Sequence, residues 1–444
     1  MTPLHEKRCY VKLGLAGLLL ALAFAAPAHA ELIGPATDDA LLAVGPDGTP
    51  FVALVRDNEV LVERRGDGGW KAQSVYSGPA RLAGLSVASG GAFNVLLEDP
   101  RGRWLTLVTS SAVTQIVRPG GKVGLLGPAG LTLDAKGAPV VAYTAMRGRV
   151  QPKYGGIPTY LRLARGQGRQ LHTSAVTRRG FPQSYVPPAA APVLVNGQIH
   201  VVETYKSAAI EWMPKRNGDW IGQYLFLSLY GSPVGPVAAV AAPGAGVWSA
   251  WTQAYPEFGE IHVLLNRRSD QVTDDVVQHG AFVALAVAGG QPEVAADDWV
   301  DLGGSRDYAG LITDPSGDRV ELDGRLLGYV ATPDGHREVV LADPSGLEWY
   351  DLPARPSVHI SLTAAADGTL SGRVEGALGG TVALYRERPG QTRELVATAA
   401  LAADGSFTAD DSAPAYPTLY RAVYPGAGTG IPYASLTRRP VGPA

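Results

Sequence analysis

Short apolar runs separated by turn residues follow one another along most of the chain. Residues 42–55 read LAVGPDGTPFVALV and residues 131–144 read LTLDAKGAPVVAYT, so each segment has an apolar run, a turn with Gly and a second apolar run. Apolar runs of about four to eight residues bounded by Gly, Pro, Asn or Asp predict β-strands. Apolar positions spaced as in an amphipathic helix, with helix caps, are hard to find. The pattern therefore predicts an all-β fold.

This two-strand unit recurs with a regular period. Weaker copies occupy residues 85–98, 192–204, 238–252 and 328–342, and their turn glycines lie about 43 to 60 residues apart, except for a last interval of about 89. The last interval fits two periods, with a degenerate unit around Gly290. A third and a fourth strand follow, for example EVLVERR (59–65) and WKAQSVY (70–76). Four short strands in a period of about 40 to 50 residues are typical of a β-propeller blade.

The period sets the number of blades. Seven blades in residues 31–355 would have about 46 residues each, and six blades with longer insertions are the alternative. The last unit lacks a fourth strand, so another segment must close the ring. We predict that residues 31–36 pair with the strand around Leu347–Leu352, and the alternative donor is Val358–Thr363.

Two turns between a third and a fourth strand end in tryptophan. They read RGDGGW (65–70) and RNGDW (216–220). Both turns resemble a degenerate form of the Asp-box hairpin of sialidase-like (BNR-like) propellers, without the Ser and Thr of that motif. This resemblance implies the propeller fold and does not imply an activity.

Proline residues mark a boundary near residue 355. Pro353 and Pro356 enclose a short linker, and the rest of the chain contains seven further alternating segments with Asp-Gly turns. Seven strands in about 88 residues resemble an immunoglobulin-like or fibronectin-like β-sandwich. We therefore expect a signal peptide in residues 1–30, a β-propeller in residues 31–355 and a small β-sandwich in residues 356–444. The sandwich is expected to be a spacer, and residues 31–354 are expected to fold without it.

The first 30 residues have the pattern of a bacterial signal peptide. Basic residues at positions 7, 8 and 12 precede the apolar stretch Leu13–Ala25, and the sequence AHA (28–30) fits cleavage after Ala30. The apolar stretch is shorter than the roughly 20 residues of a membrane-spanning helix. Cys9 precedes this stretch, whereas a lipoprotein cysteine would follow it. We expect a secreted, extracellular or periplasmic protein with no transmembrane segment in the mature chain.

The composition and the absence of certain motifs argue against several classes of protein. The chain has 55 Gly and 34 Pro, yet apolar residues still make up 46%, which a disordered chain would not have. The net charge is −3 and no long basic run occurs, which argues against nucleic acid as a partner. Cys9 is the one cysteine, so a cysteine-rich metal cluster is excluded. No phosphate-binding or dinucleotide-binding motif is found. We expect no cofactor, no metal and a monomeric protein.

Loop lengths suggest where a ligand would bind. The loops between the second and third strands of the blades converge on one face of a propeller. They are longest in the third blade (145–158) and the fifth (252–260), with residues 203–206 of the fourth blade between them. Aromatic side chains stack on sugar rings, and Arg or Lys pairs with sugar carboxylates. The candidate ligand-binding residues are Tyr143, Arg147, Arg149, Tyr154, Glu203, Tyr205, Lys206, Trp251, Tyr255 and Glu257.

Two functions fit these observations. The first is a secreted or cell-surface binding protein whose propeller binds a glycan or a protein ligand. The second is a polysaccharide-active enzyme, either a glycoside hydrolase or a lyase, with its site on the same face, because a tyrosine beside a glutamate serves such chemistry. The sequence lacks the common catalytic motifs, which favours binding, and catalytic residues cannot be assigned from it.

Overall fold

The computed structural model describes residues 30–436 apart from 119–123, 147–156, 167–169, 178–180, 184–187, 206–207, 228–230, 243–245, 259, 268–271, 302–305, 317–318, 332–335, 344, 353–357, 378, 389–392, 413–417 and 427–430. The one helical element in these residues is a 3-10 turn at Ser89–Gly91, and the other regular elements are β-strands. The predicted all-β fold is confirmed. Residues 1–29 of the predicted signal peptide lie outside the described residues, and no helix within the described residues is long and apolar enough to cross a bilayer.

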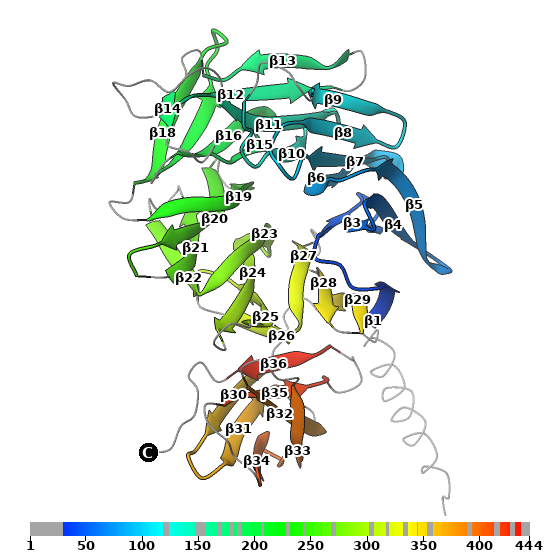
Figure 1. Ribbon diagram of the computed structural model, residues 1–444, viewed down its shortest axis with the longest axis vertical. Coiled ribbons are helices and arrows are strands. Elements are labelled where there is room, and N and C mark those ends of the chain that lie inside the picture. The colour runs from blue at the N-terminus through cyan, green and yellow to red at the C-terminus, as the bar shows by residue number, and fades with distance from the viewer. Residues whose placement is uncertain are drawn as a thin grey trace, which may run out of the picture.

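Antiparallel blades, each built on a path of four strands, surround a common axis (Figure 1). Seven such blades are present in the described residues, so the propeller is confirmed with seven blades rather than six. Blade 1 contains β2 (Ala40–Val44), β3 (Pro50–Arg56), β4 (Glu59–Gly66) and β5 (Gly69–Ser77), and blade 2 contains β6 (Arg81–Val87), β7 (Phe93–Glu98), β8 (Leu105–Thr109) and β9 (Val113–Val117). Blade 3 contains β10 (Gly130–Leu133), β11 (Pro139–Met146), β12 (Ile157–Arg165) and β13 (His172–Ala175), and β14 (Phe181–Gln183) also pairs with β12. Blades 4 and 5 contain β15 (Ala190–Val195), β16 (Gln198–Tyr205), β17 (Ala208–Pro214), β18 (Trp220–Leu227); and β19 (Ser232–Ala242), β20 (Gly246–Tyr255), β21 (Glu260–Arg267), β22 (Val272–Gln278).

Blades 6 and 7 complete the ring. Blade 6 contains β23 (Gly280–Ala288), β24 (Gln291–Asp301), β25 (Arg306–Thr313) and β26 (Arg319–Asp323). Gly290 lies in the turn between β23 and β24 with φ +82°, which confirms the degenerate unit predicted there. Blade 7 contains β27 (Arg325–Ala331), β28 (Arg337–Asp343) and β29 (Gly346–Leu352).

The first strand of each blade is the innermost one, and neighbouring inner strands approach closely. A Cβ atom added to Gly84 would lie 2.7 Å from the Leu131 side chain, and one added to Gly328 would lie 2.8 Å from that of Leu42. Glycine is therefore needed where these strands touch. Both glycines belong to an Arg-Leu-x-Gly segment, at residues 81–84 and 325–328, with a β-bulge before the glycine in each. Strands β6 and β27 therefore both begin with an arginine and have a β-bulge before the glycine.

Apolar clusters fill the space between facing sheets. The cluster between blades 1 and 2, for example, contains Phe51 and Phe93, and each of the seven pairs of adjacent blades has such a cluster. Burial of apolar area between sheets is the main stabilising contribution in such a fold. The apolar cluster between blades 6 and 7 also includes side chains of the C-terminal strands.

The ring is closed by the N-terminal strand β1 (Ala30–Gly34), as predicted. It pairs antiparallel with β29, with Ala30 opposite Tyr350 and Gly34 opposite Leu347. Ile33 is buried beneath the pairing. The alternative donor around Val358–Thr363 forms β30 (His359–Ala364) instead, which pairs with β31. Blade 7 therefore combines strands from both ends of the propeller.

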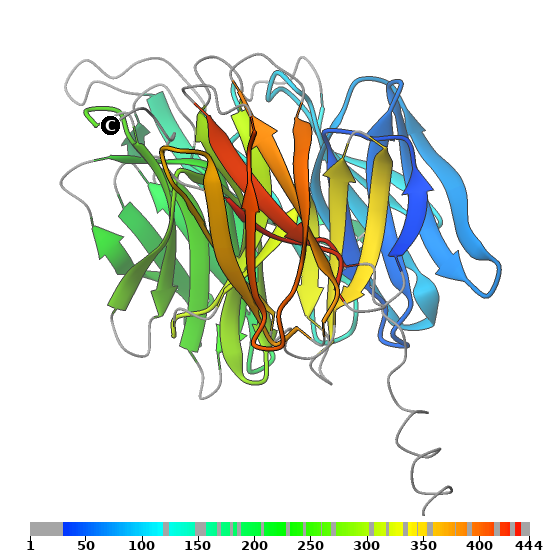
Figure 2. The ribbon, with the colours of Figure 1, turned by 90° about the horizontal axis from the view of Figure 1, so that it is seen from below.

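The C-terminal strands form two sheets. The first sheet contains β30, β31 (Thr369–Glu375) and β34 (Ser406–Asp410); the second contains β32 (Thr381–Glu387), β33 (Glu394–Ala400), β35 (Leu419–Tyr424) and β36 (Tyr433–Leu436). β36 also pairs with β26 through Leu322 and Tyr433, so blade 6 and the second sheet form one eight-stranded sheet. Figure 2 shows the orange and red strands of the sandwich against the propeller strands. The division at residue 355 and the independent folding of residues 31–354 stay predictions.

Candidate functional site

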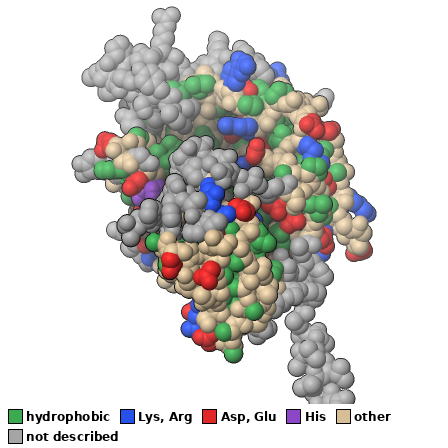
Figure 3. Space-filling view, turned by 60° about the horizontal axis from the view of Figure 1, so that its bottom comes forward, with side chains coloured by type: hydrophobic (Ala, Val, Ile, Leu, Met, Phe, Trp, Pro, Cys, Tyr) green, Lys and Arg blue, Asp and Glu red, His purple; other side chains and the backbone are tan. Residues whose placement is uncertain are grey.

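Three charged residues stand where the inner strands of blades 7, 1 and 2 begin. Arg325 and Arg81 are the first residues of β27 and β6, and Asp39 immediately precedes β2. We call the face of the propeller on which these strands begin the upper face. Asp39 lies within electrostatic range of both guanidinium groups. Basic and acidic side chains lie next to one another near the middle of Figure 3.

Arg325 links three parts of the upper face. Its Nε donates to Asp297 Oδ2 of blade 6 at 3.0 Å, and its Nη1 donates to Asp38 Oδ1 at 2.8 Å. The guanidinium also lies over the Tyr308 ring, 5.4 Å from the ring centroid. Asp38 itself is 98% exposed in its side chain, so its second oxygen is accessible to a ligand.

Arg81 is bound more loosely. Its Nη2 lies 3.4 Å from Glu98 Oε1, and no other side-chain hydrogen bond of Arg81 is found among the described residues. Its side chain is 57% exposed. A guanidinium has five N–H donors, so most of the donors of Arg81 face solvent or a ligand.

The carboxyl groups of this cluster have raised pKa values. Burial raises the pKa of Glu98 to about 7 against the opposing charge of Arg81, and burial raises the pKa of Asp297 to about 7 against that of Arg325. Burial also raises the pKa of Asp39, while the hydrogen bond from the Leu82 backbone N–H opposes this shift. Near neutral pH the cluster therefore contains both proton donors and carboxylate acceptors.

A cavity of about 500 Å³ adjoins Arg325. Its walls come from the segment after β1, from blades 6 and 7 and from the sandwich. The residues that line it are Ala36, Thr37, Asp38, Tyr308, Asp323, Gly324, Arg325, Ala342, Asp343 and Arg393. A volume of about 300 to 1,000 Å³ is typical of small-molecule sites.

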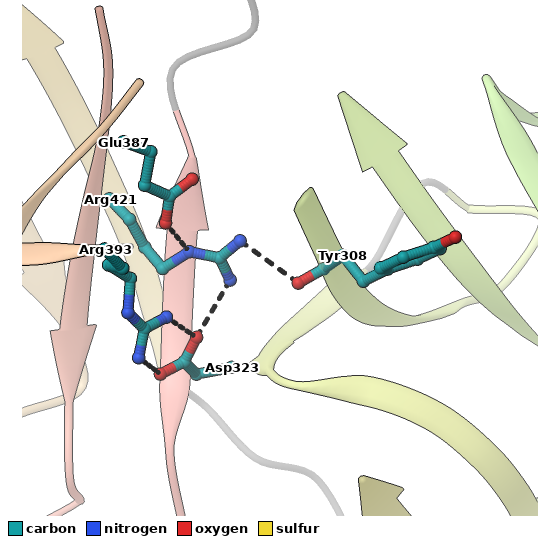
Figure 4. Close-up of polar contacts among 5 residues, drawn as sticks. All are labelled: Tyr308, Asp323, Glu387, Arg393 and Arg421. Carbon is teal, nitrogen blue, oxygen red and sulfur yellow. Dashed lines mark hydrogen bonds and ion pairs between the residues drawn. The ribbon is translucent and has the colours of Figure 1, made fainter. Parts of the chain in front are cut away.

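Arg393 is held in the cavity wall by an ion-pair network between the sandwich and blade 6 (Figure 4). Its Nη1 and Nη2 donate to the two oxygens of Asp323 at 2.6 and 2.8 Å. The fully buried Arg421 donates to Asp323 Oδ1 (2.9 Å), to Glu387 Oε1 (2.8 Å) and to the Tyr308 carbonyl oxygen (3.1 Å). Burial alone would raise the pKa of Asp323, but the two arginines outweigh it and lower the pKa. Asp323 is therefore an ionised and fully paired anchor.

Three of the predicted site residues point into the protein interior. Tyr143 belongs to the apolar cluster between blades 2 and 3. Trp251 is fully buried between blades 4 and 5, where its Nε1 donates to Gln253 Oε1 at 3.1 Å. Glu203 is buried and accepts a hydrogen bond from Trp212 Nε1 at 2.9 Å. These positions stabilise the blades rather than face a ligand.

The other predicted site residues are half-buried, exposed or outside the described residues. Tyr205 is half-buried near Glu203, and Tyr255 packs edge-on against His262 with ring centroids 4.9 Å apart. Glu257 is exposed. Arg147, Arg149, Tyr154 and Lys206 lie outside the described residues. The proposed sector of blades 3 to 5 therefore stays a prediction.

The burial of Glu203 has a measurable consequence for pH dependence. Burial raises its pKa to about 7, so the protonated form is favoured in the folded protein. The contribution of Glu203 to the free energy of unfolding is therefore complete below the pKa of this side chain in the unfolded chain, and it is lost as the pH rises through 7. The cost of ionising Glu203 is about 3 kcal/mol, given about 1.4 kcal/mol per unit of pKa shift.

We expect the free energy of unfolding of the wild-type protein to fall between pH 5 and pH 8, and Glu203→Gln to remove most of the Glu203 contribution to this fall. Urea unfolding at the two pH values measures both. Glu257→Gln, at an exposed position, serves as the control and should leave the fall unchanged. Equal pH dependence in wild type and Glu203→Gln would contradict the expectation.

The sequence contained one signal for the Arg325 and Arg81 cluster. The Arg-Leu-x-Gly segment occurs at the start of two inner strands and places an arginine on the upper face each time. Loop length, used to predict the site, gave no indication of it. Asp38 and Asp297, which pair with Arg325, are distant from it in sequence. In the described residues no group of three or more His, Cys, Asp or Glu side chains is placed to hold a metal ion.

Comparison with known proteins gives similarities of fold. No protein-family model matches the sequence, and no curated protein matches it. Among solved structures, an oligogalacturonate lyase from Vibrio parahaemolyticus has 10% identity and a TM-score of 0.48, over 74% of this chain and 91% of that one. A putative gluconolactonase has 13% identity and a TM-score of 0.37, over 75% and 94% of the two chains. A protein of unknown function from Dyadobacter fermentans has 10% identity and a TM-score of 0.41, over 72% and 98%. These values are too low to transfer an activity to this chain.

Proposed function

We propose that this protein binds a carbohydrate on the upper face of its propeller, around Arg81, Asp39 and Arg325. The observation that carries the proposal is the exposed and weakly paired guanidinium of Arg81, which lies in the same charged cluster as Asp39 and Arg325. Arg325 and Tyr308 both line a cavity next to this cluster. Sugar hydroxyls both donate and accept hydrogen bonds, so they fit alternating arginine and carboxylate groups, and an aromatic ring provides a stacking surface.

Two arginines of blade 2 allow a controlled test. Arg81 and Arg103 have nearly equal side-chain exposure, 57% and 58%, and similar contacts with a carboxylate, at 3.4 and 3.3 Å. Asp39 lies near Arg81, whereas Arg103 pairs with Asp99 in the loop after β7. Substitutions of Arg81 and of Arg103 therefore remove similar side chains that differ mainly in their distance from Asp39.

Residues 31–444 should first be screened on an array of neutral, amino and acidic oligosaccharides. We expect Arg81→Gln to weaken the affinity for the best ligand about tenfold, the value of one hydrogen bond from a charged group, and Arg103→Gln to change it less than about twofold. Isothermal titration calorimetry measures both. No binding to any glycan on the array, or equal effects of the two variants, would overturn the proposal, and capture of a protein ligand instead would replace it.

The second candidate is a glycan-degrading enzyme on the same face. The observation that favours it is Glu98, whose pKa is raised to about 7 beside the exposed Arg81. A carboxylic acid with a pKa near 7 serves well as a general acid. New reducing ends or new ultraviolet absorbance from an unsaturated sugar, lost in Glu98→Gln, would support an enzyme. Their absence over the ligands found on the array would support binding alone.

We also propose that the protein is exported and works outside the cytoplasm as a monomer. The signal-peptide pattern of residues 1–30 supports export. Mass spectrometry of the N-terminus of the exported protein tests cleavage after Ala30, and sedimentation analysis tests the monomer. The finer resemblance to sialidase-like propellers rests on the two Trp-closed turns at residues 65–70 and 216–220.

A further inference from the structure

The cavity beside Arg325 has a wall that belongs to the sandwich. Arg393, in the connection between β32 and β33, lines it together with Tyr308 and Asp323 of blade 6. The contact is fixed, because Arg393 and Arg421 both bind Asp323 and β36 continues the sheet of blade 6 (Figure 4). The cavity in this form therefore requires the docked sandwich.

Two carboxylates of this cavity offer hydrogen-bond acceptors to a ligand. Asp323 has both oxygens bound by arginines, and the two terminal nitrogens of Arg393 are used in the same contact. Asp38 is almost fully exposed and shares one oxygen with Arg325. Asp343 uses Oδ1 in its own turn, where it accepts from the Ser345 and Gly346 backbone N–H groups at 2.7 and 3.0 Å.

The balance of charge disfavours an anionic occupant. Three carboxylates and two guanidinium groups line the cavity, and the buried Arg421 behind Asp323 is itself paired with Glu387, so a ligand carboxylate would meet a surplus of negative charge. Hydroxyl or amino groups would instead donate to the second oxygens of Asp38 and Asp343. Tyr308 also lines the cavity and can supply an aromatic contact to a sugar.

We infer that this cavity binds a sugar residue that carries no carboxylate, and that the sandwich forms a wall of this subsite instead of acting as a spacer. The inference rests on the proposed carbohydrate-binding function and assigns its ligand class. It departs from the sugar carboxylates that the sequence analysis considered as partners of Arg and Lys. It also makes ligand binding and docking of the sandwich thermodynamically linked, because the ligand contacts both units.

Two identical Asp-Pro-Ser-Gly turns provide a matched pair of variants. Asp314 and Asp343 each begin such a turn, and the Oδ1 of each accepts from the serine two residues later, from its N–H at 2.8 and 2.7 Å and from its hydroxyl at 2.5 Å. Asparagine can keep these turn contacts. Asp343 lines the cavity, and Asp314 lies in the turn between β25 and β26, outside the lining.

The test is calorimetry on residues 31–444 with pentamers of glucose, glucosamine and galacturonic acid. We expect the glucosamine pentamer to bind at least about tenfold more tightly than the galacturonic acid pentamer, Asp343→Asn to weaken its binding about tenfold, and Asp314→Asn to change it less than about twofold. Arg393→Ala should also weaken it, whereas Arg373→Ala, at an exposed position of the sandwich, should not.

The outcomes separate the inference from the function on which it rests. Tighter binding of galacturonic acid, or equal effects of Asp343→Asn and Asp314→Asn, would overturn the assigned ligand class while leaving carbohydrate binding intact. Unchanged binding in Arg393→Ala would overturn the role of the sandwich. The absence of binding to any glycan would overturn the proposed function itself, and the inference with it.

Discussion

Removal of residues 31–37 from a protein of residues 31–444 is expected to lower its melting temperature by about 5 °C or more, since a loss of a few kcal/mol shifts the melting temperature of a large domain by that amount. The deletion removes the strand that pairs with β29 and exposes the outer edge of blade 7. It also removes the buried Ile33 and the ion pair between Glu31 and Arg65, whose guanidinium lies over the Trp349 ring at 4.4 Å. Differential scanning calorimetry measures the effect.

Two neighbouring residues of β1 provide the control. Ile33 is 9% exposed and Leu32 is 62% exposed, because successive side chains of a strand point to opposite faces. Ile33→Ala should cost about 2 kcal/mol, within the range for partly filled core sites, and Leu32→Ala should cost little. An unchanged melting temperature after the deletion, or equal effects of the two alanine variants, would show that β1 does not close the ring in solution.

The second large effect is expected for Arg421→Met. Arg421 is fully buried, binds Glu387 within the sandwich, and binds Asp323 and the Tyr308 carbonyl oxygen across the boundary with the propeller. Loss of one partner of a buried ion pair costs about 3 to 5 kcal/mol, because the remaining charge stays buried. We expect the wild-type protein to unfold in one calorimetric transition, and the variant to show a separate earlier transition of the sandwich.

Arg373→Met is the control for this result. Arg373 lies in the same sandwich on β31, is exposed, and donates from Nε to the Asp404 carbonyl oxygen at 2.9 Å. It should leave the single transition in place. Two transitions in the wild type would show that the shared sheet and the ion-pair network do not couple the units, whereas one unchanged transition in Arg421→Met would show that this arginine is not needed for coupling.

Much of the fold could be predicted because its signals are local. Turn glycines such as Gly48 and Gly137 both have positive φ, and the apolar runs beside them are strands at the predicted places. The regular spacing then gave seven blades. Ring closure followed from a count of strands, because a last blade with three strands leaves an unpaired edge.

The candidate site and the docking of the sandwich could not be predicted in the same way. Asp38 and Arg325 form an ion pair across 287 residues, and no local pattern reports such a contact. The pairing of Leu322 with Tyr433 crosses a linker that looked like a boundary. Trp251 is a predicted ligand-binding candidate because the long loop at residues 252–260 follows it, but its side chain lies between blades 4 and 5 and is fully buried. Loop length shows where residues are inserted between strands, and these insertions do not coincide with the place where charged side chains converge.

Closure of the ring by β1 has a consequence for the order of folding. The segment nearest the N-terminus needs a partner, Leu347–Tyr350, that is made more than 300 residues later. An exported chain that emerges N-terminus first therefore keeps its leading strand unpaired until almost the whole propeller has followed. Such non-local pairing is slow, and the free edges are open to other chains in the meantime. If the chain is exported as proposed, rapid translocation or a companion protein that shields the leading strand would favour ring closure over pairing with other chains, whereas a propeller closed within its last blade would leave no such strand waiting.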